Sequence, residues 1–123
     1  MELNEYQNKA MSTCMPSCDN ITYMASNLVA EVGELCGKIA KARRHGDVSI
    51  NFDQMEYQHN IDFGFSRAAF KEELKNELGD VLWQVSGFAK VMGWSLEDVA
   101  QANISKLRSR AERNVIEGNG DNR

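Results

Sequence analysis

The sequence predicts an all-α protein of the four-helix-bundle type, and three observations lead to this expectation. The 123 residues include one proline, so long segments run without a helix breaker. Within these segments, apolar residues recur with the spacing of a helix face. The composition, with 42% hydrophobic and 26% charged residues, is close to that of globular domains. A chain of this length builds one core more readily than two, so residues 1–123 are expected to form a single domain.

The first two helices are bounded by proline and glycine. A helix over about residues 3–14 should end before Pro16, because the residue before a proline is pushed out of helical geometry. A second helix over about residues 20–44 should stop at His45-Gly46, since glycine is favoured just past a helix end.

Two further helices are expected in the second half of the chain. Residues 67–92 keep a helical apolar period up to Gly93. Ser95 should act as an N-cap, because Ser95-Leu-Glu-Asp98 resembles a capping box with Asp in the position of Glu. The helix that follows should continue to about Asn114.

Two segments lack a helical pattern. Residues 46–66 are polar with scattered aromatic residues, and they predict an inserted loop with room for a short hairpin. The glycine-rich tail over residues 117–123 is either a frayed end or a backbone cradle for a phosphate.

The second and third expected helices carry the same arrangement of side chains at 100° per residue. An acidic pair borders an apolar stripe on each helix: Glu31 and Glu34 on the second, Glu77 and Asp80 on the third. The stripes themselves consist of Leu28, Val32, Leu35 and Ile39, and of Leu74, Leu78, Val81 and Val85. If the helices pack through these stripes, the four carboxylates come together.

Such a group of carboxylates favours a metal ion. Two ionised carboxylates about 5 Å apart in an effective dielectric near 20 repel by roughly 3 kcal/mol, and a divalent cation removes this repulsion. Carboxylate oxygens are hard ligands that favour Mg²⁺, or Mn²⁺ in its place, over zinc. The alternative is that the acidic pairs are ordinary parts of a solvated helix face.

Each acidic pair also encloses a glycine, Gly33 or Gly79. Glycine inside a helix costs about 1 kcal/mol relative to alanine, so we expect another backbone or a ligand to come close at these positions.

The fourth expected helix has a basic and amidic border instead of an acidic one. Asn103, Lys106 and Arg110 stand where acids stand on the other helices. A metal-bearing acidic site faced by lysine and arginine suits a polyphosphate, because the cation and the basic groups share its charge. The alternative is an amphipathic helix with a solvated basic edge.

Together these residues resemble the MazG-like nucleoside triphosphate pyrophosphohydrolases. The resemblance is carried by Glu31-x-x-Glu34 in Glu-Val-Gly-Glu-Leu, Glu77-x-x-Asp80 in Glu-Leu-Gly-Asp-Val-Leu-Trp, the opening Leu-Asn-Glu-Tyr-Gln, and residues 93–100 and 103–110. It implies an all-α fold, assembled as a homodimer or homotetramer, that hydrolyses the α–β phosphoanhydride of a nucleotide to the monophosphate and pyrophosphate.

The resemblance also implies a role for each candidate residue. Glu31, Glu34, Glu77 and Asp80 would hold magnesium, and one of them would orient or deprotonate the attacking water. Candidates for binding the phosphates or the rest of the nucleotide are Lys38, Asn103, Lys106, Arg110, Arg123 in the tail, and Gln7 as a contact to the base.

The inserted segment departs from the family, whose acidic pairs usually lie closer than the 42 residues between Glu34 and Glu77 here. The segment is expected to form a lid, to contact a neighbouring subunit, or to shape a base pocket with its aromatic residues. Those residues are Phe52, Tyr57, Phe63 and Phe65, and each is individually expected to serve local packing.

Composition and charge also indicate which partners and which cellular location to expect. The formal net charge of −4 argues against a general affinity for nucleic acid or anionic lipid, and no apolar run or signal peptide is evident, so we expect a cytoplasmic protein. The three cysteines are expected to be reduced. Two alternatives to the leading function stay open: an enzyme like phosphoribosyl-ATP pyrophosphatase, and a non-catalytic helical regulator that binds nucleotide or metal.

Overall fold

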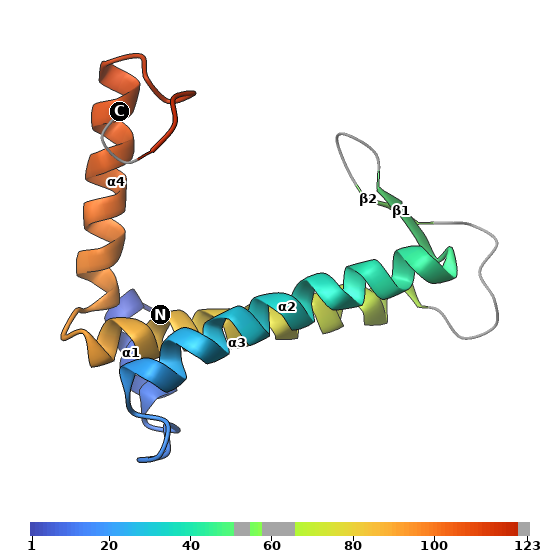
Figure 1. Cartoon of the computed structure of the whole chain (residues 1–123), viewed down its shortest axis with the longest axis horizontal. Coiled ribbons are helices and arrows are strands. Elements are labelled where there is room, and N and C mark those ends of the chain that lie inside the picture. Colours follow the sequence, from blue (N-terminus) through green and yellow to red (C-terminus); the bar gives the residue numbers. More distant parts are fainter. Residues whose placement is uncertain (51–54, 58–65, 121–123) are drawn as a thin grey trace.

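The computed structural model describes residues 1–50, 55–57 and 66–120, and this part of the chain is mostly helical (Figure 1). Its elements are α1 (Leu3–Met11), α2 (Ile21–His45), β1 (Val48–Ile50), β2 (Met55–Tyr57), α3 (Arg67–Val91) and α4 (Leu96–Glu112). The all-α class is confirmed. None of the helices in these ranges combines the length and hydropathy that a bilayer crossing requires.

The helix ends follow the capping signals of the sequence. Asn20 caps α2 by accepting a hydrogen bond from the Tyr23 amide at 2.9 Å, and α2 ends at Gly46, whose φ of 80° is left-handed. Ser66 and Ser95 cap α3 and α4 through the same type of bond. The Asp98 amide donates to the Ser95 hydroxyl at 3.0 Å, as in a capping box, and this hydroxyl in turn donates to Asp98 Oδ2 at 2.7 Å.

α1 ends at Met11, three residues earlier than expected. Ser12 and Thr13 follow, and their hydroxyls donate to the backbone carbonyls of Lys9 and Ala10, each at 2.7 Å. Such local side-chain bonds compete with continued helix, so the helix stops before the proline requires it to.

Within residues 46–66, the expected hairpin is present. β1 and β2 pair antiparallel, with Val48 opposite Tyr57. Val48 joins Ala42 and Phe70 in a small apolar cluster at this end of the α2–α3 pair. Tyr57 serves local packing, because its ring lies 6.4 Å from that of Phe70 and 4.5 Å from the Arg67 guanidinium. The three phenylalanines Phe52, Phe63 and Phe65 lie outside the described residues.

α2 and α3 lie side by side along the length of the molecule and form its body (Figure 1). At the end opposite the hairpin, α1 packs on α3. The Trp83 indole donates to the Ala10 carbonyl at 3.1 Å and lies 3.0 Å from the Thr13 hydroxyl, so Trp83 joins α3 to the end of α1. Nearby, Met24 of α2 is fully buried against Gly87 of α3.

α4 points away from the α2–α3 pair instead of lying along it (Figure 1). The four helices of one chain therefore do not form a closed bundle, and this part of the fold prediction is wrong for the single chain. The cause is the short turn at Gly93 (φ 75°), which redirects the chain before α4 starts. On α4, the apolar side chains of Ile104 and Leu107 are 50% and 44% exposed.

Candidate functional site

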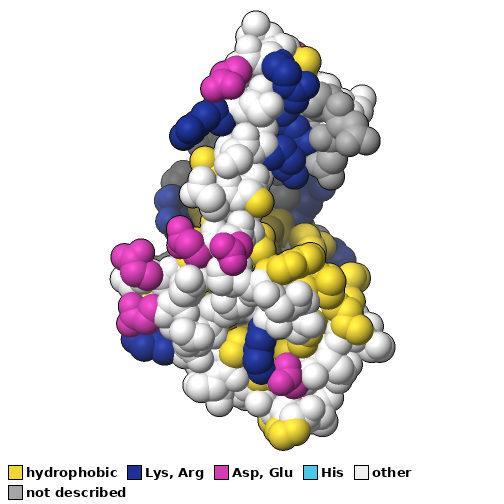
Figure 2. Space-filling view, turned by 90° about the vertical axis from the view of Figure 1, so that its left-hand side faces the viewer, with side chains coloured by type: hydrophobic (Ala, Val, Ile, Leu, Met, Phe, Trp, Pro, Cys, Tyr) yellow, Lys and Arg dark blue, Asp and Glu magenta, His cyan; other side chains and the backbone are white. Residues whose placement is uncertain are grey.

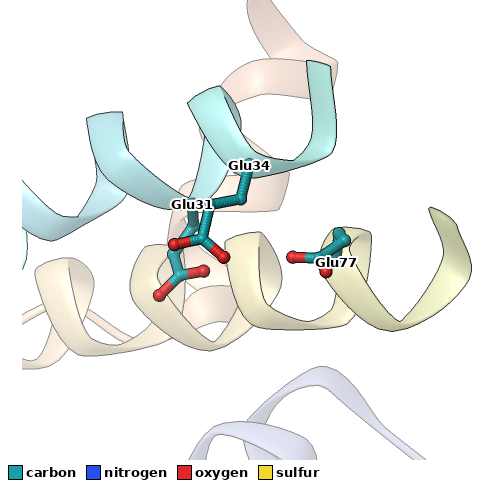
Figure 3. Close-up of side chains that lie close together, drawn as sticks. All are labelled: Glu31, Glu34 and Glu77. Atoms are coloured by element: carbon teal, nitrogen blue, oxygen red, sulfur yellow. The ribbon is translucent and has the colours of Figure 1, made fainter. Parts of the chain in front are cut away.

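Three carboxylates from the two long helices form the centre of the candidate site. Glu31 and Glu34 lie one turn apart on α2, and Glu77 faces them from α3 (Figure 3). Each residue offers one carboxylate oxygen, and these three oxygens all lie within 4.8 Å of one another. Glu31 and Glu77 are half-buried, whereas Glu34 is exposed. We call these three residues the acidic cluster.

The sequence brings the acidic cluster together through helical spacing. Residues three or four apart share a face of a helix, and α2 and α3 meet along the faces that carry the acids. The grouping of Glu31, Glu34 and Glu77 was expected from this spacing. Asp80, the fourth predicted acid, is exposed and lies outside the cluster in the described residues. Burial first, and then the charge of Asp80, raise the pKa of Tyr6 on α1, so Asp80 is close to that hydroxyl.

Two neighbouring side chains hold the cluster in place. Asn27, one turn before Glu31, donates to its Oε1 at 2.9 Å. Lys38 Nζ lies 3.2 Å from Glu77 Oε1 and 3.6 Å from Glu73 Oε2. The hydrogen bond to Glu77 is the largest cause of the raised pKa of Lys38, so this lysine is charged at neutral pH. Lys38 therefore lies beside one acid of the cluster, Glu77, and has Glu73 as a second partner.

The acidic cluster fits a magnesium ion in its donor chemistry. Magnesium prefers oxygen ligands at about 2.0–2.1 Å, so two ligands of one ion lie at most about 4.2 Å apart. The upper limit of 4.8 Å in the cluster exceeds this slightly. Glutamate side chains have rotatable bonds that allow the small adjustment needed, and Glu34 is exposed.

The candidate residues on α4 do not reach the acidic cluster. Asn103 and Lys106 are exposed and line an open cavity of about 650 Å³ along α4, together with Trp94 and Val99. Arg110 is buried, at 6% exposure, and its Nη2 donates to the Gly120 carbonyl at 3.2 Å. Arg110 therefore holds the tail against α4, and the expectation that it faces the acids is wrong for this chain on its own. Arg123 lies outside the described residues.

Gln7 has a structural position. It is buried, its amide donates to the carbonyls of Ser86 (3.3 Å) and Trp94 (3.1 Å), and its oxygen accepts from the Leu96 amide (3.0 Å). These bonds join α1 to the corner between α3 and α4 and engage both the nitrogen and the oxygen of the amide, and the contact of Gln7 with a base stays a prediction. At Gly33 and Gly79, no described atom beyond the surrounding turns of the same helix lies within 4 Å of an added Cβ, so the single chain makes no close approach there, and the approach of another backbone or a ligand stays a prediction.

Sequence reasoning missed a polar group beyond the acidic cluster, at its α1 end. Gln84 of α3 is 3% exposed, and its Oε1 has no hydrogen-bond partner among the described residues. A hydrogen bond with Cys18 is the largest cause of the raised pKa of Tyr23, while a bond from Gln84 lowers it and the charge of Glu31 raises it. Tyr23 thus lies near both Gln84 and Glu31. The signal was available, since Gln84 shares the helical face of Glu77 and Asp80.

Comparison with known proteins agrees with this arrangement. Residues 20–115 match the MazG nucleotide pyrophosphohydrolase domain. Gene 37 protein of Mycobacterium phage L5 is 36% identical over 130 aligned positions that cover 100% of both chains. The uncharacterized protein YvdC of Bacillus subtilis (strain 168) is 47% identical over 47 residues, which span 38% of this chain and 44% of that protein. No solved structure gives a significant match. The match over most of the chain, together with the paired acids on α2 and α3, identifies the chain as a member of the MazG nucleotide pyrophosphohydrolase domain family.

Proposed function

We propose that the chain is a magnesium-dependent nucleoside triphosphate pyrophosphohydrolase that releases a nucleoside monophosphate and pyrophosphate. The observation that carries this proposal is the acidic cluster, in which oxygens of Glu31, Glu34 and Glu77 approach within 4.8 Å. Membership of the MazG family supports the reaction class. Its substrates are canonical or modified (deoxy)nucleoside triphosphates, and its role is the cleansing or control of the nucleotide pool.

In the proposed reaction, the oxygen of a water molecule bonds to the α-phosphorus. The bond from that phosphorus to the α–β bridging oxygen breaks, and pyrophosphate leaves with this oxygen. A carboxylate of the acidic cluster or Asp80 orients the water and accepts its proton. Asn27 holds Glu31 in position, and Lys38 is near enough to the cluster to bind a phosphate oxygen. A bound Mg²⁺ would supply Lewis-acid stabilisation of the charge that the polyphosphate develops.

We further propose that the working unit is a homodimer or homotetramer. Val32 directly follows Glu31, and Leu78 directly follows Glu77, so each lies 100° around its helix from the acids. Because α2 and α3 run antiparallel, these two positions fall on one side of the pair. Val32 and Leu78 are 42% and 58% exposed, and Val29 and Leu82 extend the same side. A second copy would cover this surface, which we call the apolar side. It would also offer an α4 whose Asn103 and Lys106 are exposed.

The test is incubation of the purified chain with Mg²⁺ and a nucleotide panel in water enriched in ¹⁸O. We expect monophosphate and pyrophosphate, with the label in the monophosphate because the water attacks the α-phosphorus. Glu34→Gln and Asp80→Asn should each lower kcat/KM by about 100-fold or more, in the range of losses seen when a group that stabilises a transition state is removed. Glu72→Gln is the matched control, because Glu72 is an exposed acid on α3 that pairs with Lys75.

Other outcomes separate the alternatives. Release of orthophosphate and a diphosphate, or full activity of both acid variants, would contradict the mechanism. Preference for phosphoribosyl-ATP, included in the panel, would assign the other pyrophosphatase reaction. Nucleotide binding without turnover would instead indicate a regulator.

A further inference from the structure

The amide oxygen of Gln84 is a buried acceptor without a partner in the described structure. The residue is 3% exposed, no described group donates a hydrogen bond to this oxygen, and the oxygen is closed to solvent. Leaving a buried polar group unsatisfied costs about 1–3 kcal/mol. The Gln84 amide also hydrogen-bonds to Tyr23, and because this bond lowers the pKa of Tyr23 it comes from the amide nitrogen, which leaves the oxygen available to a donor from a ligand.

The position of Gln84 connects it with the acidic cluster. It follows Asp80 by four residues and Glu77 by seven on α3, so it lies about 6 Å and 10 Å further along the same helical face. On α2, Tyr23, Asn27 and Glu31 follow one another at intervals of four residues on the facing side. The hydroxyl of Tyr23 is close to both the Gln84 amide and the carboxylate of Glu31. Polar groups therefore continue from the cluster toward Gln84.

The two ends of this polar row differ in chemistry. Beyond the cluster in one direction stands Lys38, a cation suited to phosphate oxygens. In the other direction stand the neutral groups of Asn27, Tyr23 and Gln84. An amide oxygen needs a hydrogen-bond donor, which an ionised phosphate lacks and which sugar hydroxyls and the N–H groups of bases supply.

We propose that Gln84, with Tyr23 beside it, is the nucleoside end of the substrate site, where the amide oxygen accepts a hydrogen bond from a sugar hydroxyl or a base N–H. This inference rests on the proposed function, because it places the α-phosphate at the acidic cluster. The oxygen is enclosed, so the Gln84 or Tyr23 side chain must turn when the nucleoside binds. Both side chains have rotatable bonds that permit this movement.

The test uses Gln84→Leu, which removes the acceptor and puts an apolar side chain of similar size in its place. Binding is measured by calorimetry with α,β-methylene nucleoside triphosphates, which resist cleavage at the scissile position, in the presence of Mg²⁺. The variant should bind the preferred nucleotide about 10-fold more weakly, as expected for one lost hydrogen bond of about 1.4 kcal/mol. The ligand-free variant should have nearly the same thermal stability as the original chain, because it loses the unsatisfied acceptor together with the hydrogen bond from Gln84 to Tyr23. Gln101→Leu, at an exposed amide on α4, is the matched control and should change neither quantity.

Two sets of ligands distinguish the donors. If a sugar hydroxyl binds Gln84, the original chain should bind nucleotides with ribose, 2′-deoxyribose and 3′-deoxyribose with different affinities. Gln84→Leu should bind these nucleotides with similar affinities. If a base N–H binds, the variant loses the preference among bases instead. Unchanged affinity for every nucleotide, or a uniform loss accompanied by a lower melting temperature, would overturn the inference.

The proposed function and this inference fail in different ways. If the original chain hydrolyses nucleotides and Gln84→Leu binds them equally well, the function stands and the inference falls. If the original chain binds nucleotides without cleaving them, the function falls, and the binding preferences still decide the inference. If no nucleotide binds at all, both are wrong.

Discussion

Among single residues, Lys38 has the most direct influence on the acidic cluster. Its ammonium group lies 3.2 Å from Glu77 and 3.6 Å from Glu73, and its side chain is 35% exposed. A divalent cation bound by Glu77 would compete with this lysine for the same carboxylate. A lysine displaced from Glu77 would remain within reach of a phosphate at the cluster. Lys38 is therefore expected to oppose metal binding and to support nucleotide binding.

Lys38→Met should separate these two effects. We expect Mg²⁺ to bind at least as tightly as before when no nucleotide is present, because a competing positive charge has been removed. The KM for the nucleotide should rise about 10-fold, because a charged hydrogen bond to phosphate contributes about 1.5–3 kcal/mol when it is made. Titration with Mn²⁺, followed by electron paramagnetic resonance, measures the metal, and steady-state kinetics measure the substrate.

Lys75→Met is the control for this experiment. Lys75 is an exposed lysine on α3 that pairs with Glu72 and is remote from the cluster in its contacts. It should affect neither constant. Weaker metal binding in Lys38→Met, with an unchanged KM, would show that Lys38 orders the carboxylates and does not bind phosphate.

The parts of the site that could be predicted from the sequence are those whose residues interact through helical spacing. Contacts between residues far apart along the chain could not be predicted. Glu31, Glu34 and Glu77 were predictable because their grouping needs only helical spacing and a packed pair of helices. Gln7 was not, because its partners on Ser86, Trp94 and Leu96 lie 79 to 89 residues away. Arg110 was misjudged because the tail that buries it follows α4 and has no helical period.

At the scale of the elements, the helix ends were predictable and the packing between helices was only partly so. Asn20, Ser66 and Ser95 cap their helices with their own side chains, so a short stretch of sequence contains the whole signal. The contact between Met24 of α2 and Gly87 of α3 has no such local signal. Met24 is 0% exposed, and its side chain occupies the space that any residue larger than glycine would need at position 87.

Gly87→Ala should therefore destabilise the α2–α3 pair. A Cβ at this position would overlap Met24 Sδ and lie 2.6 Å from Met24 Cε. Adding atoms to a packed interior typically costs about 1–3 kcal/mol, and chemical denaturation measures this loss in the free energy of unfolding. Adding Met24→Ala should cost less in the Gly87→Ala background than in the original chain, because the added methyl group occupies part of the space vacated.

Gly33→Ala provides the contrasting control. No described atom lies within 4 Å of a Cβ there, so the variant should be unchanged or more stable by about 1 kcal/mol from helix propensity. If Gly33→Ala and Gly87→Ala destabilise equally, the contact with Met24 is not the cause.

At the scale of the whole molecule, surfaces of different character remain exposed. Lys and Arg side chains lie along α4, and hydrophobic side chains gather on one side of the body below it (Figure 2). The direction of α4 is set by Gly93 and by contacts with α1, including a 3.1 Å bond from the Glu97 amide to Asn4 Oδ1. Such contacts between distant segments could not be predicted from helical patterns, so the sequence predicted four helices and the pairing of α2 with α3, but not the direction of α4.

Leu78→Asp tests the proposed role of the apolar side in assembly. Leu78 is 58% exposed, so a charge there should leave the fold of the single chain intact while disfavouring burial against a second copy. Light scattering coupled to size-exclusion chromatography should show a dimer or tetramer for the original chain and a smaller species for the variant. Circular dichroism should show the same helical content in both.

Ile116→Asp is the matched control, because Ile116 is also 58% exposed but lies in the tail beyond α4. It should keep the original mass. A monomeric original chain, or equal mass for the original chain and Leu78→Asp, would show that the apolar side is not the interface.

The distribution of buried residues along the α2–α3 pair gives the acidic cluster a second consequence. Fully enclosed side chains gather at the two ends, around Met24 and Gly87 and around Ala42 and Phe70, whereas the middle of the pair carries Glu31 and Glu77 in half-buried positions. A cation shared by these carboxylates would act as a cross-brace between the two longest helices, at the point where hydrophobic cohesion is weakest. Ion occupancy would then be thermodynamically linked to folding, and an ion at 100 times its Kd would add about 2.7 kcal/mol to the stability of the native state.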